Sequence, residues 1–212
     1  MIIRVKYKKG EEVKYVGHLD AMRTFTRCLK RTNIPVEYSK GFNPRIQISF
    51  ALPLGVGVTS DLDYFDLILE SRMNKEIFLS ELNSVLPLGF KVLDAEYIEE
   101  KKSLMSLVKE AKYQITLETN VKKEEIEKLL SEEKIIINKE SKCKKKNEEI
   151  DIRSFILDSK VENIEERKII IKIHSTAGSV NNLNPLYLIN AINEKIGLIE
   201  DYEIKREALI LA

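Results

Sequence analysis

The sequence predicts an α+β protein made of two tandem ferredoxin-like sandwiches, each with βαββαβ order and an antiparallel sheet. Short segments of alternating apolar and polar residues, typical of half-buried strands, recur along the chain. Between them lie segments whose apolar residues fall on one helical face. The order seen in residues 1–100 recurs in residues 101–212, which predicts two domains with these bounds.

In the first half, strands are predicted at residues 2–7, 63–70 and 90–98, and residues 36–39, a loop at 40–45 and the run 46–52 follow the first helix. The first helix is expected at residues 19–31, where Met22, Phe25 and Leu29 share one face. A second helix should begin after Asn74, because asparagine is a favoured N-cap residue.

In the second half, strands are predicted at residues 112–118, 134–139, 167–174 and 199–211. One helix is expected at residues 122–131. Another should begin at Asn184 and Pro185 and end at Gly197, since proline suits the first turn of a helix and glycine its end.

The composition argues against several classes of protein. The two cysteines, Cys28 and Cys143, have no ligand partners at metal-binding spacing, so we expect no metal site and no cofactor. No segment approaches the length of a membrane span, and residues 1–10 do not resemble a signal peptide. These features predict a soluble cytoplasmic protein.

Charge is distributed unevenly, although 35 Lys and Arg nearly balance 34 Asp and Glu overall. Residues 1–50 hold eleven bases and four acids, whereas residues 61–100 hold three bases and ten acids. Arg23, Arg27 and Arg31 recur at the i, i+4, i+8 spacing of one helix face, with Lys30 beside them. This arginine-rich face is either a polyanion site or a solvated face, or it pairs with the acidic second quarter of the same domain.

The loop after this helix mixes bases with aromatic residues. Its candidate binding residues are Tyr38, Lys40, Phe42, Asn43 and Arg45. Aromatic rings interleaved with cations are typical of single-stranded RNA recognition, in which bases stack and phosphates are neutralised. The alternative is a hairpin loop in which Phe42 packs against its own sheet. A second basic run, residues 139–146, predicts a solvated loop that could add nonspecific affinity.

Only two histidines are present, His18 and His174. His18 could bind phosphate or, oriented by Asp20, act as a general base in a metal-independent ribonuclease. No other catalytic pattern is visible, so a non-catalytic protein is the main expectation.

Several motifs together resemble the bacterial radical-SAM-linked domain family, a domain of unknown function. They are residues 15–20, 23–31, 35–36, 38–44 and 48–57, and more thinly residues 151–153 and Arg206. The resemblance implies a stand-alone accessory protein whose radical SAM partner supplies the iron–sulfur cluster, and this chain indeed lacks the three-cysteine motif. The architecture also resembles RNA-processing proteins of CRISPR systems, by analogy alone.

We therefore expect an accessory protein that binds RNA, such as tRNA or rRNA, and presents it to a radical SAM enzyme. Two alternatives remain open. The arginine-rich face could dock on the partner enzyme without RNA, or His18 could serve a ribonuclease.

Overall fold

The computed structural model describes residues 1–99, 102–140, 147–178 and 181–212, and these fall into two compact units. Unit 1 comprises Met1–Lys109 together with Arg206–Ala212, and unit 2 comprises Glu110–Lys205. The end of the chain thus belongs with the first unit. The predicted boundary between residues 100 and 101, and residues 141–146 of the second basic run, lie outside the described residues.

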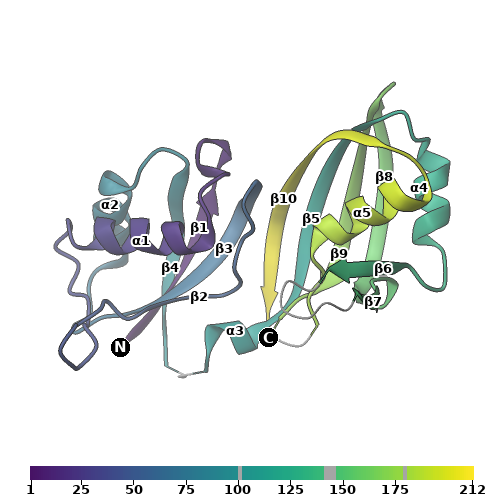
Figure 1. Ribbon diagram of the computed structural model, residues 1–212. Helices are drawn as coiled ribbons and strands as arrows, with labels where there is room; N and C mark the ends of the chain where they lie inside the picture. Colours follow the sequence, from purple (N-terminus) through teal and green to yellow (C-terminus); the bar gives the residue numbers. More distant parts are fainter. Residues whose placement is uncertain (100–101, 141–146, 179–180) are drawn as a thin grey trace. The chain divides into compact units, whose positions relative to one another are not determined.

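Unit 1 contains the strands β1 (Ile2–Lys9), β2 (Ile48–Phe50), β3 (Val58–Ile68) and β4 (Phe90–Ile98). Its helices are α1 (His18–Leu29), α2 (Lys75–Val85) and the short α3 (Leu104–Leu107). The strands lie in the order β4-β1-β3-β2, and each of these neighbouring pairs is antiparallel. Figure 1 shows α1 and α2 beside this sheet, and both helices contribute to its apolar core.

The core of unit 1 is centred on aromatic rings from α1 and the sheet. Phe25 of α1 is fully buried, and its ring lies 5.1–5.6 Å from the rings of Tyr7, Phe50, Phe65 and Phe90. The predicted apolar face of the first helix is therefore the face that packs on the sheet. Because this face is fixed by packing, the opposite face of α1 points to solvent.

The strands of unit 2 are β5 (Val108–Thr119), β6 (Ile136–Glu140), β7 (Asn147–Asp151), β8 (Ile156–Glu165), β9 (Lys168–Thr176) and β10 (Ile199–Leu211). The first two residues of β5 and residues 206–211 of β10 are grouped with unit 1. Its helices are α4 (Lys123–Leu130) and α5 (Pro185–Lys195). The main strands lie in the order β10-β5-β9-β8, and α5 crosses in front of them in Figure 1. The core includes fully buried Ile115, Ile171, Leu188 and Ile192.

The second strand of unit 2 is not the segment that the sequence predicted. Residues 134–139 do contain a strand, β6, but it pairs with β7 in a separate two-stranded sheet. β9 lies between β5 and β8, and β8, at the edge of this sheet, was not predicted. Its side chains do not alternate between buried and exposed, and Ile156 and Val161 are its only buried residues. The signal that identifies a strand is therefore missing.

The two asparagine N-caps predicted from the sequence are confirmed. The side chain of Asn74 accepts a hydrogen bond from the backbone N–H of Ile77 at 3.0 Å, as an N-cap does. Asn184 likewise accepts from the N–H of Leu186 at 3.1 Å, with Pro185 as the first residue of α5. The structure confirms the α+β class with mostly antiparallel strands. Within the described residues, no helix is long and apolar enough to cross a membrane.

Candidate functional site

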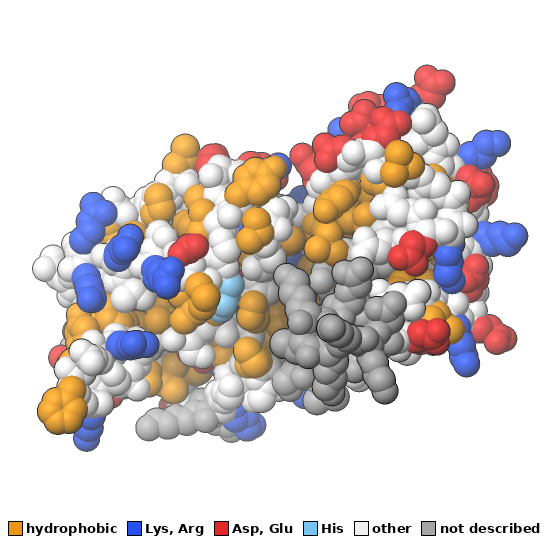
Figure 2. Space-filling view, in the orientation of Figure 1, with side chains coloured by type: hydrophobic (Ala, Val, Ile, Leu, Met, Phe, Trp, Pro, Cys, Tyr) orange, Lys and Arg blue, Asp and Glu red, His pale blue; other side chains and the backbone are white. Residues whose placement is uncertain are grey.

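A groove with a volume of about 660 Å³ lies between α1 and residues 44–48 of unit 1. Its cations, called here the groove cations, are Arg23, Arg27, Lys30 and Arg45. Its apolar lining consists of Leu19, Met22, Pro44, Ile46 and Ile48. Thr26 completes the groove. Figure 2 shows Lys and Arg side chains gathered over the region of α1, with hydrophobic side chains between them.

The period of the helix explains why one groove receives both kinds of side chain. The six α1-side residues run from Leu19 to Lys30 at the offsets 0, 3, 4, 7, 8 and 11, which follow one face of an α-helix. Opposite them, the chain is held by a hydrogen bond from the N–H of Ser39 to the carbonyl of Arg45 at 2.8 Å. The Ser39 hydroxyl also accepts from the N–H of Arg45 at 3.0 Å. These bonds hold the second wall, and Met22 and Ile48 from the two walls both pack against the core of unit 1.

The groove cations are largely unneutralised by the residues that the structure describes. Arg23 bonds Asp20 at 2.9 Å, but both side chains are about two-thirds exposed. Arg27, Lys30 and Arg45 make no ion pair with any residue that the structure describes. A solvated pair such as Arg23–Asp20 contributes little stability and can yield to a ligand.

The described acids of residues 61–99 make no ion pair with the arginine-rich face. Its carboxylates bind β1 instead, where Asp66 pairs with Arg4, Asp94 with Lys6, and Asp61 with Lys8. Asp94 also contacts Lys75, and Asp63 binds Arg206. The alternative in which these acids engage the helix is therefore not what the described residues show. These acids therefore neutralise bases of β1, and the excess of positive charge that remains is on the arginine-rich face.

The structure brings together only part of the predicted site. Arg23, Arg27, Lys30 and Arg45 line the groove, whereas His18, Arg31, Tyr38, Lys40, Phe42 and Asn43 do not. Arg31 lies beyond Leu29, where α1 ends. Its N–H bonds the carbonyl of Cys28, three residues back, so the tighter turn takes Arg31 off the i+4 row. The apolar lining was missed, although Leu19 and Met22 share the helical phase of the arginines.

Phe42 does not pack against the sheet. Its side chain is fully exposed, in a loop where Gly41 has a φ of +130° that disfavours other residues. The alternative of a buried Phe42 is therefore wrong. Tyr38, by contrast, is held by a bridge to Ile46 and is 40% exposed.

The two histidines have separate local environments. The ring of His18 meets Phe50 edge-on at 5.6 Å, and burial lowers the pKa of His18. His174, in unit 2, lies 2.6 Å from a carboxylate oxygen of Glu110. Burial therefore disfavours the charged form of His18, the form that would attract phosphate. Within the described residues, no three His, Cys, Asp or Glu side chains gather to hold a metal ion.

A buried ionic cluster lies inside unit 1. Asp63 and Arg206 are each 1% exposed, and Arg206 Nη2 donates to Asp63 Oδ2 at 2.6 Å. Lys9 is 2% exposed, and its Nζ donates to the carbonyl of Lys14 at 2.9 Å. Burial lowers the pKa of Lys9 to about 8, because the ammonium loses hydration.

We expect the stability of the fold to rise with pH through the titration of Lys9. Between pH 8 and 10.5, the unfolded chain still holds the proton that folded Lys9 has released, which favours folding as pH increases. Over this window the wild type should gain about 2–3 kcal/mol relative to Lys9→Met. Urea unfolding of both proteins across this range measures the gain. The half-exposed neighbour Lys8 provides the control Lys8→Met, and equal pH dependence in both variants would contradict the prediction.

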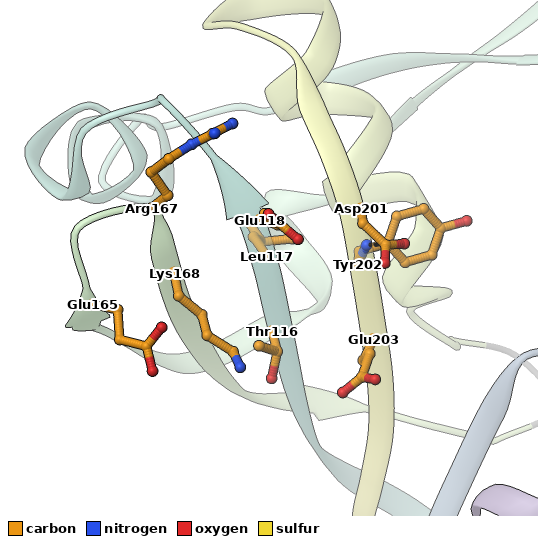
Figure 3. A pocket seen from close by; sticks show the side chains of 9 residues that line it. All are labelled: Thr116, Leu117, Glu118, Glu165, Arg167, Lys168, Asp201, Tyr202 and Glu203. Carbon is orange, nitrogen blue, oxygen red and sulfur yellow. Dashed lines mark hydrogen bonds between the residues drawn. The ribbon is translucent and has the colours of Figure 1, made fainter.

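Unit 2 has a smaller pocket of about 240 Å³ on its sheet. Figure 3 shows its charged side chains, in which Glu118, Glu165, Asp201 and Glu203 outnumber Arg167 and Lys168. Arg167 is also paired with Glu200. This excess of carboxylates repels an anionic ligand, so the groove of unit 1 is the better candidate for a polyanion site.

A family model described as an uncharacterized protein conserved in bacteria (DUF2344) matches residues 3–185. No curated protein matches the chain. The chain is similar to a chain in the crystal structure of a Cbf5-Nop10-Gar1 complex, with 14% identity and a TM-score of 0.50, over 98% of this chain and 48% of that one. It is also similar to a chain in an archaeal box H/ACA sRNP Nop10-Cbf5 complex, with 12% identity and a TM-score of 0.47, over 98% and 47%. This chain thus spans about half the length of those solved chains, and the likeness concerns the fold.

Proposed function

We propose that this chain, which belongs to the DUF2344 family of bacterial proteins, is a cytoplasmic accessory protein that binds RNA through the groove of unit 1. The observation that carries the proposal is the convergence of Arg27, Lys30 and Arg45 on one groove without an ion pair to any described residue. Their like charges repel one another, and bound phosphates would remove that repulsion.

The geometry of the groove favours a ligand with several anionic groups. Arg23 and Lys30 are seven residues apart on α1, which at the rise of an α-helix corresponds to about 10 Å. A polynucleotide presents a phosphate with every nucleotide and can meet several cations of such a row together. The planar guanidinium of arginine also binds two phosphate oxygens at once.

A salt titration of RNA binding tests the proposal. We expect the affinity of the wild type for a polyuridylate oligonucleotide to fall steeply between about 50 and 200 mM salt. Arg27→Gln and Lys30→Gln should each weaken binding and lower the slope of log K against log salt by about 0.7, as expected for one lost phosphate contact on a single strand.

Arg31→Gln is the matched control, because Arg31 follows the same helix but does not line the groove. Its salt slope should remain that of the wild type. Affinity that does not respond to salt, or equal losses from Arg31→Gln and Arg27→Gln, would argue against the groove as a phosphate site.

We further propose a class of RNA and a partner enzyme. That the RNA is a tRNA or rRNA, presented to a radical SAM enzyme, rests on the sequence resemblance of residues 15–57 alone. Co-purification with such an enzyme should then be reduced by nuclease. Co-purification that resists nuclease but is lost in Arg27→Glu would instead support direct docking on the enzyme, without RNA.

We also propose that the chain forms two tandem ferredoxin-like domains, residues 1–100 and 101–212, in which β10 completes the second domain although its residues 206–211 are grouped with unit 1. The strand orders support this, because β4-β1-β3-β2 in unit 1 corresponds to β10-β5-β9-β8 in unit 2. In both units the fourth strand lies beside the first, and the third strand lies between the first and the second.

A further inference from the structure

The groove of unit 1 combines a cationic surface with an apolar surface, and a simple anion would contact only the cationic one. Besides the groove cations, it has an apolar lining from both walls, in which Leu19 and Pro44 are exposed, Met22 and Ile48 are partly buried and Ile46 is buried. Leu19 is 65% exposed, although it lies one helical turn from Arg23. A ligand that offers both an apolar face and negative charge can cover this apolar surface and neutralise the cations together.

We infer that the groove is selective for single-stranded RNA, with an unpaired base against the apolar lining and its flanking phosphates on the groove cations. This inference rests on the proposed function and names its substrate class. The charge of the groove requires the anionic backbone of the ligand, and the apolar lining requires that the same ligand offer an apolar face. An unpaired nucleotide has both.

A duplex cannot satisfy the same groove. In A-form RNA the base faces are stacked inside the helix, and the outer surface presents phosphates and ribose hydroxyls. A duplex placed on the groove cations would cover the apolar lining with polar groups. Unpaired bases expose flat apolar faces that pack on apolar and aromatic side chains regardless of sequence.

Phe42 supplies a second contact of the same kind. Its ring is fully exposed two residues before Pro44, where the chain enters the groove. Lys40 on the same loop is also exposed. A base next to the one in the groove can stack on Phe42, which accounts for an aromatic ring kept in solvent.

Competition between two forms of one RNA tests the inference. A fluorescent single strand bound to the full chain is displaced by the same unlabelled strand, either alone or in a perfect duplex. We expect the single strand to compete at least tenfold better. Phe42→Ala should weaken single-strand binding about tenfold, within the range measured for the loss of one stacked base. Leu19→Ser should weaken it severalfold.

The slope of log K against log salt distinguishes single-strand selectivity from the proposed RNA-binding function. Phe42→Ala and Leu19→Ser remove no charge, so their salt slopes and their duplex affinities should equal those of the wild type. Leu88→Ser is the control, because Leu88 is 79% exposed in the same unit but does not line the groove.

Two outcomes would overturn single-strand selectivity. Equal competition by duplex and single strand, with Arg27→Gln still weakening both, would refute the selectivity and leave RNA binding intact. Unchanged single-strand affinity in both Phe42→Ala and Leu19→Ser would refute the role of the apolar lining. If Arg27→Gln and Lys30→Gln have no effect on either RNA, the proposed function itself fails.

Discussion

Asp63→Ala is expected to lower the free energy of unfolding by about 3–5 kcal/mol, because it leaves a buried guanidinium without its carboxylate. Arg206 binds Asp63 Oδ2 through Nη2 at 2.6 Å and Nε at 3.2 Å, and Nη2 also donates to the carbonyl of Leu52 at 3.0 Å. Both side chains are 1% exposed, so water cannot replace the lost partner. Chemical denaturation monitored by circular dichroism measures the change.

A double variant distinguishes the loss of a charge pair from the loss of packing. Asp63→Leu combined with Arg206→Met removes both charges and should be more stable than Asp63→Ala. The exposed pair Arg23–Asp20 is the matched control, and Asp20→Ala should cost less than about 1 kcal/mol. If Asp63→Ala costs no more than Asp20→Ala, the burial of the pair has no energetic consequence and the prediction is wrong.

The same ion pair shows what sequence patterns cannot predict. Arg206 and Asp63 are 143 positions apart, and neither position carries a local signal for the other. The helix caps at Asn74 and Asn184 could be predicted because cap and helix are neighbours in the chain. The extents of β4 and β10 agree with the predicted residues 90–98 and 199–211 for the same local reason. Contacts between residues that are far apart in the sequence had no such local signal.

The candidate site was likewise predictable where it depends on local spacing and not where it depends on long-range contacts. Helical spacing alone placed Arg23 and Arg27 on one face, and the structure finds both in the groove. The second wall could not be anticipated, because Ile46 and Ile48 reach the groove through the pairing of Ser39 with Arg45. The predicted stripe also extended to Arg31, since the sequence did not show that α1 ends at Leu29.

Phe25→Ala is expected to cost about 3–5 kcal/mol of stability, because it opens a cavity at the centre of the aromatic core. Phe25 is fully buried, and its ring contacts Phe65 at 5.1 Å and Phe90 at 5.2 Å. Phe25→Leu keeps most of the volume and should cost less. Thermal unfolding of both variants gives the comparison, and equal stability of Phe25→Ala and wild type would contradict a packed core.

Stability and binding should therefore separate on the two faces of α1. Phe25 faces the sheet, whereas Arg27, two positions along the helix, lines the groove. Arg27→Gln should change stability by less than about 0.5 kcal/mol while weakening RNA binding, because an exposed cation contributes little to the fold. Phe25→Ala should lower stability, while the molecules that remain folded should bind RNA as the wild type does. An Arg27→Gln variant as unstable as Phe25→Ala would show that Arg27 supports the fold and is not held ready for an anionic ligand.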